Sequence, residues 1–255
     1  MIHLIVGLLG VALTVTVLAD AFQTVVVARQ SRRLPRLTGH FYHFSWLPAA
    51  ALARLIRSER SRERYIGLYG PLSLLLLMGL CAGGLILAFA ALQWSVNTVS
   101  PSSEASFLHE MYFSAASFFT LGFEEPRSLA GKYLMVLEAG LGFSFLGLVI
   151  GYLPVLYQSF SSRELRILLL DARAGTPPSA VQFILRRGSD PARLEQRLAE
   201  WEEWALDLLE GHLSYPMLAF YRSQHMNQSW LAALTTVTDV SPCDVGRVRR
   251  PQASG

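Results

Sequence analysis

The sequence predicts an all-α membrane protein. It has three transmembrane helices, one short apolar segment that enters the membrane without crossing it, and a helical domain in the cytoplasm. Two observations lead to this fold class. The 255-residue chain is 52% hydrophobic and only 16% charged, and its apolar residues gather in three long segments, each long enough to span a bilayer. The carboxyl-terminal third is polar and shows helical rather than β periodicity.

Residues 1–28 are expected to form an amino-terminal transmembrane helix. Between residues 2 and 27 the only charged or titratable side chains are His3 and Asp20. No positively charged stretch precedes the segment and no small-residue cleavage site follows it, which favours a retained helix over a signal peptide. An acid inside a membrane helix is costly. Asp20 is therefore either functional or paired near the interface, with Arg29 or a neighbour.

Residues 29–65 are expected to form a cytoplasmic basic segment, because nine arginines stand there against two glutamates. Short loops rich in arginine stay in the cytoplasm, which places the amino terminus outside. Residues 48–65 are predicted to form an amphipathic helix along the inner leaflet. Clustered arginines attract anionic lipid headgroups. The alternative is that these arginines only set the topology. The lipid-binding candidates are Arg54, Arg57 and Arg60.

Residues 66–160 form one predicted membrane module. Its outer helix, 66–94, carries no charged residue. Residues 107–120 are too short to span and suit a re-entrant helix, which is tolerated only where it is buried in protein or lines water. The third span is 133–160. Arg127 and Lys132 precede it, whereas Arg163 and Arg166 follow it, so the same charge rule places the carboxyl terminus in the cytoplasm.

Residues 112–126 read YFSAASFFTLGFEEP. This stretch resembles the pore loop of potassium channels, whose pattern runs Tyr-Phe-Ser, a Thr-rich stretch and then Thr-Val-Gly-Tyr-Gly-Asp-Pro, with no insertion or deletion between the two. The resemblance covers residues 66–160. The chain resembles the bacterial channels that have a two-helix pore module and no voltage sensor, and it has one extra amino-terminal helix.

The resemblance implies a selectivity filter at residues 120–124 and a homotetramer with cyclic symmetry. In such a filter, rings of backbone carbonyls and one threonine hydroxyl replace the hydration shell of the permeant ion. That ion is potassium, and no other cofactor is expected. Gly122 supplies the backbone freedom that this geometry needs. The positions implied to hold potassium are Thr120, Leu121, Gly122 and Phe123.

Glu124 departs from the family pattern, which has its second filter glycine at this position. A glutamate adopts the left-handed conformation poorly, so the outermost ion site is expected to be distorted or missing. Four copies each of Glu124 and Glu125 would ring the outer mouth. Such acidic rings favour cations in general and weaken the selectivity for potassium over sodium.

Two features of the third span are candidates for gating and for support of the filter. Gly147, Gly151 and Pro154 soften a helix, and in related channels such bends open a cytoplasmic gate. The alternative is that the glycines only permit close packing. Glu138 either braces the filter from behind by hydrogen bonding or pairs with Lys132.

Residues 161–240 are expected to form a helical cytoplasmic domain, and residues 241–255 a disordered tail. Within the domain, residues 193–213 predict an amphipathic helix. The polar and aromatic cluster around His225 either binds a ligand, senses pH through His225, or joins or caps helices. No Gly-x-Gly-x-x-Gly follows a strand, so a dinucleotide fold is not expected. The apolar face of the predicted helix contains Leu194, Leu198, Trp201, Ala205 and Leu208.

These features favour a tetrameric potassium channel of the cell membrane that conducts passively. One alternative is a weakly selective cation channel, and another is a non-conducting membrane scaffold or sensor with a degenerate filter. No arginine ladder lies within a span, so steep voltage sensing is not expected. An enzyme is not expected, because no nucleophile and base are arranged together. No nucleic-acid partner is expected either.

Overall fold

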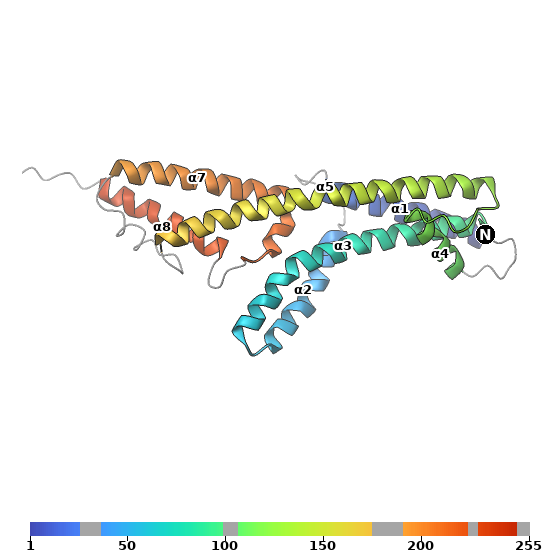
Figure 1. Cartoon of the computed structure of the whole chain (residues 1–255), viewed down its shortest axis with the longest axis horizontal. Coiled ribbons are helices and arrows are strands. Elements are labelled where there is room, and N and C mark those ends of the chain that lie inside the picture. Colours follow the sequence, from blue (N-terminus) through green and yellow to red (C-terminus); the bar gives the residue numbers. More distant parts are fainter. Residues whose placement is uncertain (26–36, 99–106, 175–190, 224–228, 249–255) are drawn as a thin grey trace, which may run out of the picture. The chain divides into compact units, whose positions relative to one another are not determined.

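The computed structural model describes residues 1–25, 37–98, 107–174, 191–223 and 229–248. Within these ranges every regular element is a helix and no strand occurs, which confirms the all-α fold class (Figure 1). The elements are α1 (Ile2–Val25), α2 (Leu37–Leu55), α3 (Glu59–Ser95), α4 (Phe107–Phe118), α5 (Leu129–Ala174), α7 (Pro191–Ser214), the 3-10 helix η1 (Pro216–Phe220) and α8 (Trp230–Val248).

Three helices are long and apolar enough to cross a membrane, as expected: residues 2–24, 59–95 and 129–170. The second and third extend beyond the predicted spans 66–94 and 133–160. At about 1.5 Å per residue, α3 and the third segment measure about 55 and 63 Å, whereas the hydrocarbon core is about 30 Å thick. The ends of both helices therefore continue into water.

The predicted amphipathic helix 48–65 is instead divided between two helices. α2 ends at Leu55, residues 56–58 are not helical, and α3 begins at Glu59. Ser58 precedes the new helix, and its carbonyl oxygen accepts a hydrogen bond from the Arg62 amide at 2.9 Å. Serine is favoured just before a helix and an acid in its first turn, so Ser58 and Glu59 together start α3 here.

The described chain divides into two compact units. The first contains residues 1–48 and 72–154, and the second contains residues 49–71 and 155–255. In the first unit α1 packs closely on α3. A side chain at Gly10 would lie 2.9 Å from the Ala88 carbonyl oxygen, and one at Gly84 would lie 3.2 Å from Val17. Small residues at these positions let the two backbones approach each other.

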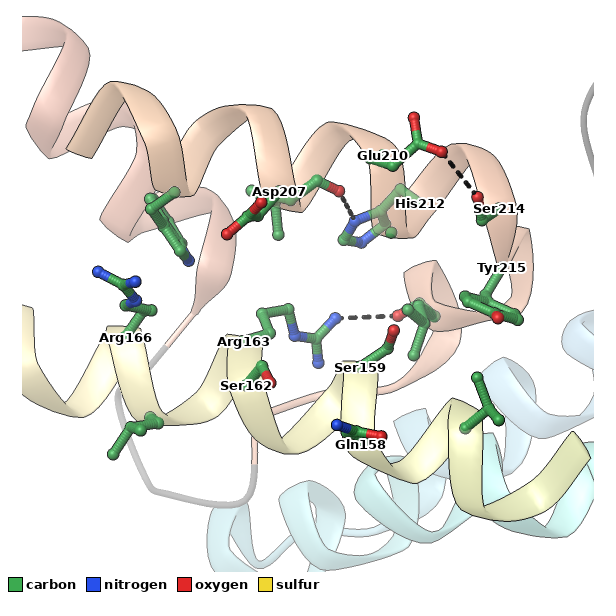
Figure 2. A pocket seen from close by; sticks show the side chains of 16 residues that line it. Gln158, Ser159, Ser162, Arg163, Arg166, Asp207, Glu210, His212, Ser214 and Tyr215 are labelled. Atoms are coloured by element: carbon green, nitrogen blue, oxygen red, sulfur yellow. Dashed lines mark hydrogen bonds between the residues drawn. The ribbon is translucent and has the colours of Figure 1, made fainter. Parts of the chain in front are cut away.

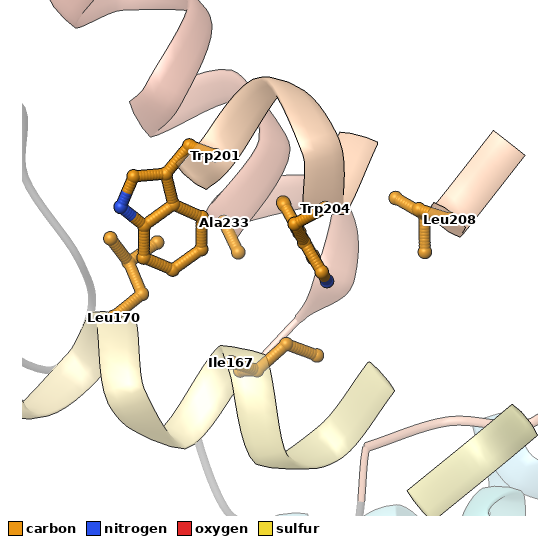
Figure 3. Close-up of a cluster of buried hydrophobic side chains, with 6 residues drawn as sticks. All are labelled: Ile167, Leu170, Trp201, Trp204, Leu208 and Ala233. Carbon is orange, nitrogen blue, oxygen red and sulfur yellow. The ribbon is translucent and has the colours of Figure 1, made fainter. Parts of the chain in front are cut away.

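The second unit has a core built from α5, α7 and α8. Figure 3 shows its buried members, Ile167, Leu170, Trp201, Trp204, Leu208 and Ala233. Trp201 and Leu208 belong to the face predicted for α7, and Ala205 is half-buried. The side chains of Leu194 and Leu198 lie outside the description. Trp204 was absent from the predicted face, although it stands three residues after Trp201, and the two rings meet edge to face at 5.3 Å.

The carboxyl-terminal boundary also differs from the prediction. The tail was expected to begin at residue 241, but α8 continues to Val248. Residues 249–255 lie outside the described part of the chain.

Replacing Trp204 with alanine should destabilise the second unit by about 3–5 kcal/mol, the usual cost of truncating a fully buried tryptophan. Thermal unfolding of the purified protein in detergent measures the loss. Leu206→Ala on the same helix is the control, because Leu206 is 61% exposed. Equal effects of the two substitutions would show that α7 does not bury Trp204.

Candidate functional site

Helix α4 has 12 residues and is about 18 Å long, too short to cross a membrane. The sequence predicted a helix at 107–120, and α4 ends two residues earlier, at Phe118. One face is buried and carries polar side chains, including Glu110, Ser114 and Ser117. A short helix with a buried polar face needs partners for those groups, and these partners form the site.

The end of α4 sets the backbone of the segment that follows. The Leu121 amide donates to the Ala116 carbonyl at 2.8 Å, and the Thr120 amide donates to the Ser117 carbonyl at 2.9 Å. These two bonds form a Schellman motif with Thr120 in the left-handed position. Its φ is +57°. Glycine usually occupies that position, so a β-branched threonine there is strained.

Gly122 is the second left-handed residue of the segment, with φ +66°. A positive φ is the kind of backbone conformation for which a glycine was expected at this position. Glu124 is not among the described residues with positive φ. The chain therefore passes position 124 without the left-handed conformation that a second filter glycine would provide, and a glutamate fits there without backbone strain.

Glu138 ties α5 to both α3 and α4. Its side chain is completely buried. Gln93 Nε2 on α3 donates to one carboxylate oxygen at 2.5 Å, and the Ser114 hydroxyl on α4 contacts the other. Ser114 Oγ also lies 2.7 Å from the Ile86 carbonyl of α3. Two partners were expected for Glu138, the region behind the filter or Lys132. Its hydrogen bonds run to Gln93 and to Ser114 of the short helix α4, and not to Lys132.

Gly142 brings α5 against the end of α4. A side chain there would lie 2.1 Å from the Phe118 carbonyl oxygen, closer than any real contact. Gly142 stands four residues after Glu138, so both residues face α4 from the same side of α5. Sequence reasoning singled out Gly147 and Gly151 of this helix and missed Gly142, since only the fold shows which glycine meets another backbone.

The segment after α4 folds back along that helix. His109 Nε2 lies 3.2 Å from a carboxylate oxygen of Glu124, and the rings of Tyr112 and Phe123 stack at 6.4 Å. Glu124 is half-buried and Glu125 is exposed. The sequence did not reveal that His109 is a partner of Glu124.

The predicted hinge residues Gly147, Gly151 and Pro154 all lie within α5, which Figure 1 draws as one uninterrupted helix. In the part of the chain that the structure describes, no atom lies within 4 Å of the position that a β-carbon at Gly147 or Gly151 would take. Close packing inside one chain therefore does not account for these two glycines. Their role in gating stays a prediction.

Two further candidates from the sequence have structural partners. Asp20 is buried and accepts a 2.8 Å hydrogen bond from the Thr38 hydroxyl of α2, so a neighbour satisfies it; Arg29 lies outside the described residues. Most of the cluster around His225 also lies outside them. In its described part the Ser223 hydroxyl, in the non-helical residues after η1, donates to Glu164 of α5 at 2.5 Å.

Residues 74–158 match the model of a family described as ion channel. The match begins within α3, includes α4 and the segment after it, and ends within α5, close to the 66–160 range of the resemblance. Neither a curated protein nor a solved structure matches the chain. The family match supports an ion channel in a membrane.

Replacing Gly142 with alanine should destabilise the first unit by about 1–3 kcal/mol, because the new methyl group forces α5 away from α4. Gly140→Ala is the matched control. Nothing lies within 4 Å of a side chain at Gly140, and alanine is a better helix former than glycine by up to about 1 kcal/mol. Thermal unfolding in detergent distinguishes the two, and a Gly142→Ala protein as stable as Gly140→Ala would contradict the packing.

Glu138→Ala should cost about 1–3 kcal/mol, because the buried Gln93 amide loses its acceptor, whereas Ser114 can still donate to the Ile86 carbonyl. Glu138→Gln keeps one acceptor and adds a donor, so it should retain most of the stability. The same unfolding measurement compares them. If alanine and glutamine are equally tolerated, the hydrogen bonds of Glu138 do not hold the three helices together.

Proposed function

We propose that four copies of this chain form a potassium-preferring channel, in which Thr120, Leu121, Gly122 and Phe123 provide the ion path. The observation that supports it best is the backbone of this segment. Left-handed residues at 120 and 122 alternate with residues of ordinary φ at 121 and 123. In a regular strand successive carbonyls point to opposite sides, whereas alternating handedness turns them toward one side, as a ring of carbonyl ligands requires.

The proposed tetramer follows from the geometry of such a path. One chain supplies one segment, and a ring of ligands needs several copies around an axis. In the single chain Leu121 and Phe123 are 56% and 63% exposed. Apolar side chains that are so exposed inside a membrane contact either lipid or other copies of the chain. Contact with other copies would bring the four segments 120–123 together.

Conduction through this path would be passive. We assign the cytoplasmic gate to Gly147, Gly151 and Pro154, where a bend in α5 would move the inner ends of four helices apart. The amino terminus would lie outside and the carboxyl terminus in the cytoplasm, since the arginines of residues 29–64 favour that side. Arg54, Arg57 and Arg60 are all exposed and would meet anionic headgroups of the cell membrane.

A weakly selective cation channel is the second candidate, and Glu124 favours it. This residue stands where the pattern has a glycine, its backbone is not left-handed, and its carboxylate is drawn to His109. A filter that lacks its outermost ion site would discriminate less between potassium and sodium. The acidic mouth would still attract cations of either kind.

Ion flux into proteoliposomes tests the proposal, first with a potassium gradient and then with a sodium gradient, each with and without barium. Potassium flux that barium blocks, with little sodium flux, is the expected result. Equal flux of both ions would favour the weakly selective channel. Absence of flux from folded tetramers across pH, voltage and lipid composition would overturn the channel and leave a membrane scaffold.

Glu124→Gly should raise the potassium-to-sodium permeability ratio by about tenfold, equivalent to about 1.4 kcal/mol of added discrimination, because it restores the flexible position of the outer ion site. Reversal potentials in bilayers measure the ratio. Glu125→Gly removes the same charge one residue later without restoring that position, so it should raise the ratio much less. If both substitutions shift it equally, the effect is one of charge and not of backbone.

A further inference from the structure

Three helices cross between the two compact units, and each crosses at a proline. The division falls directly after Pro48 in α2, after Pro71 in α3 and after Pro154 in α5, and all three prolines lie inside their helices. A proline has no amide hydrogen to donate and its ring crowds the preceding turn, so a helix bends most easily there. Within the described residues, each crossing between the units is therefore a point where a helix bends easily.

Pro71 and Pro154 stand at the same level of two helices that run side by side. The Thr98 carbonyl accepts a hydrogen bond from the Arg127 amide at 3.0 Å, next to one end of each helix, and Glu138 joins the same helices farther along. From that end Pro71 lies 24 residues along α3, and Pro154 lies 25 residues along α5. These lengths are about 36 and 38 Å at about 1.5 Å per residue. Neighbouring helices that bend at the same level can bend together without sliding along each other.

Beyond the prolines, one segment of the second unit binds α5. We call it the strap, and it consists of η1 and the three residues after it, 216–223. The Arg163 side chain of α5 points toward η1, and its Nη1 donates to the Leu218 carbonyl at 3.0 Å (Figure 2). Its Nη2 donates to the Tyr221 carbonyl at 2.6 Å. Arg163 is only 5% exposed, so water does not compete for these bonds and the strap stays on α5.

The strap also lies against α3, on the turn that ends at its proline. Arg222 Nη2 lies 3.0 Å from a carboxylate oxygen of Glu63. A β-carbon at Gly70 would lie 2.9 Å from the ring of Tyr221, so the strap touches the α3 backbone where only a glycine leaves room. The parts of α3 and α5 beyond the prolines are thus both fastened to the strap, and through it to each other.

We propose that the second unit turns as one body about Pro48, Pro71 and Pro154, so that α3 bends whenever α5 bends. If α5 bent alone, it would have to break the buried hydrogen bonds of Arg163 or pull the strap away from α3. The consequence for gating rests on the proposed channel, in which α5 carries the gate. There α3, which does not line the ion path, becomes a moving part of the gate.

Hydrogen exchange of the backbone amides tests the proposal without requiring conduction. It is measured by mass spectrometry on the full-length protein in lipid nanodiscs. Pro71→Ala restores an amide that can donate to the Gly67 carbonyl, so α3 should bend less. If the two helices bend together, amides within one turn of Pro154 should exchange up to about tenfold more slowly, the effect of one added hydrogen bond on local opening. Slower exchange around residue 71 alone, with α5 unchanged, would overturn the proposal.

Gly79→Ala is the control for a stiffer α3. Gly79 lies eight residues from Pro71 and inside the first unit, and no described atom lies within 4 Å of a β-carbon there. Alanine therefore raises the helix propensity of α3 away from the unit boundary, and exchange around Pro154 should not change. Equal slowing in Gly79→Ala and Pro71→Ala would contradict a hinge at the prolines.

Two glycines one turn apart test the strap. A β-carbon at Gly70 would lie 3.1 Å from the Phe220 carbonyl as well as against the Tyr221 ring, whereas no described atom lies within 4 Å at Gly67. Gly70→Ala should push the strap off α3, so that Pro71→Ala no longer slows exchange in α5 when the two are combined. Combined with Gly67→Ala, Pro71→Ala should keep its effect. The same full effect in both combinations would show that the strap does not couple the helices.

Potassium flux into proteoliposomes tests the link to the gate. Pro71→Ala should lower the barium-sensitive flux up to about tenfold, for the same added hydrogen bond, and Gly79→Ala should leave it unchanged. Unchanged flux in Pro71→Ala would show that α3 takes no part in gating. If no form of the protein conducts but the exchange in α5 still responds to Pro71→Ala, the proposed channel fails and the shared bending of α3 and α5 holds.

Discussion

The structure of the first unit depends on one constraint: polar groups buried away from water must find partners inside the protein. Glu138 meets it with Gln93 of α3 and Ser114 of α4, so three helices are held by one carboxylate. Gly142, one turn later on α5, lets the backbone of α4 come into contact. The position of α4 then fixes where the chain leaves it at Thr120, and hence where the segment 120–124 lies.

Much of this fold could be predicted from the sequence, because the bilayer imposes length and hydropathy on each span. The three long helices and the short helix from Phe107 follow from those quantities alone. Contacts between distant residues could not be predicted. That Glu138 meets Ser114 rather than Lys132, and that Glu124 meets His109, depends on how the helices pack. The left-handed Thr120 was missed for another reason: its hydrogen bonds form a motif that usually carries glycine, so its residue type gave no signal.

The backbone of the segment 120–124 does not have the left-handed residue at position 124 that the resemblance suggested. Glutamate at position 124 would be costly if its backbone had to be left-handed. Within the segment 120–124 that conformation occurs at 120 and 122 only, so the glutamate is compatible with the fold. In the proposed channel, the substitution would change the outermost ligand site and the charge near it. Selectivity, rather than stability, is therefore the property in which this chain would differ from the potassium-channel pattern.

Locating permeant ions is the most direct test of the central claim, which is that residues 120–123 of four chains form an ion path. Crystals grown in rubidium or thallium would reveal the ions by their anomalous scattering. The account predicts four copies around one axis, with ions in line between the carbonyls of Thr120, Leu121, Gly122 and Phe123. Copies that meet through other surfaces, with no ion beside these residues, would contradict it.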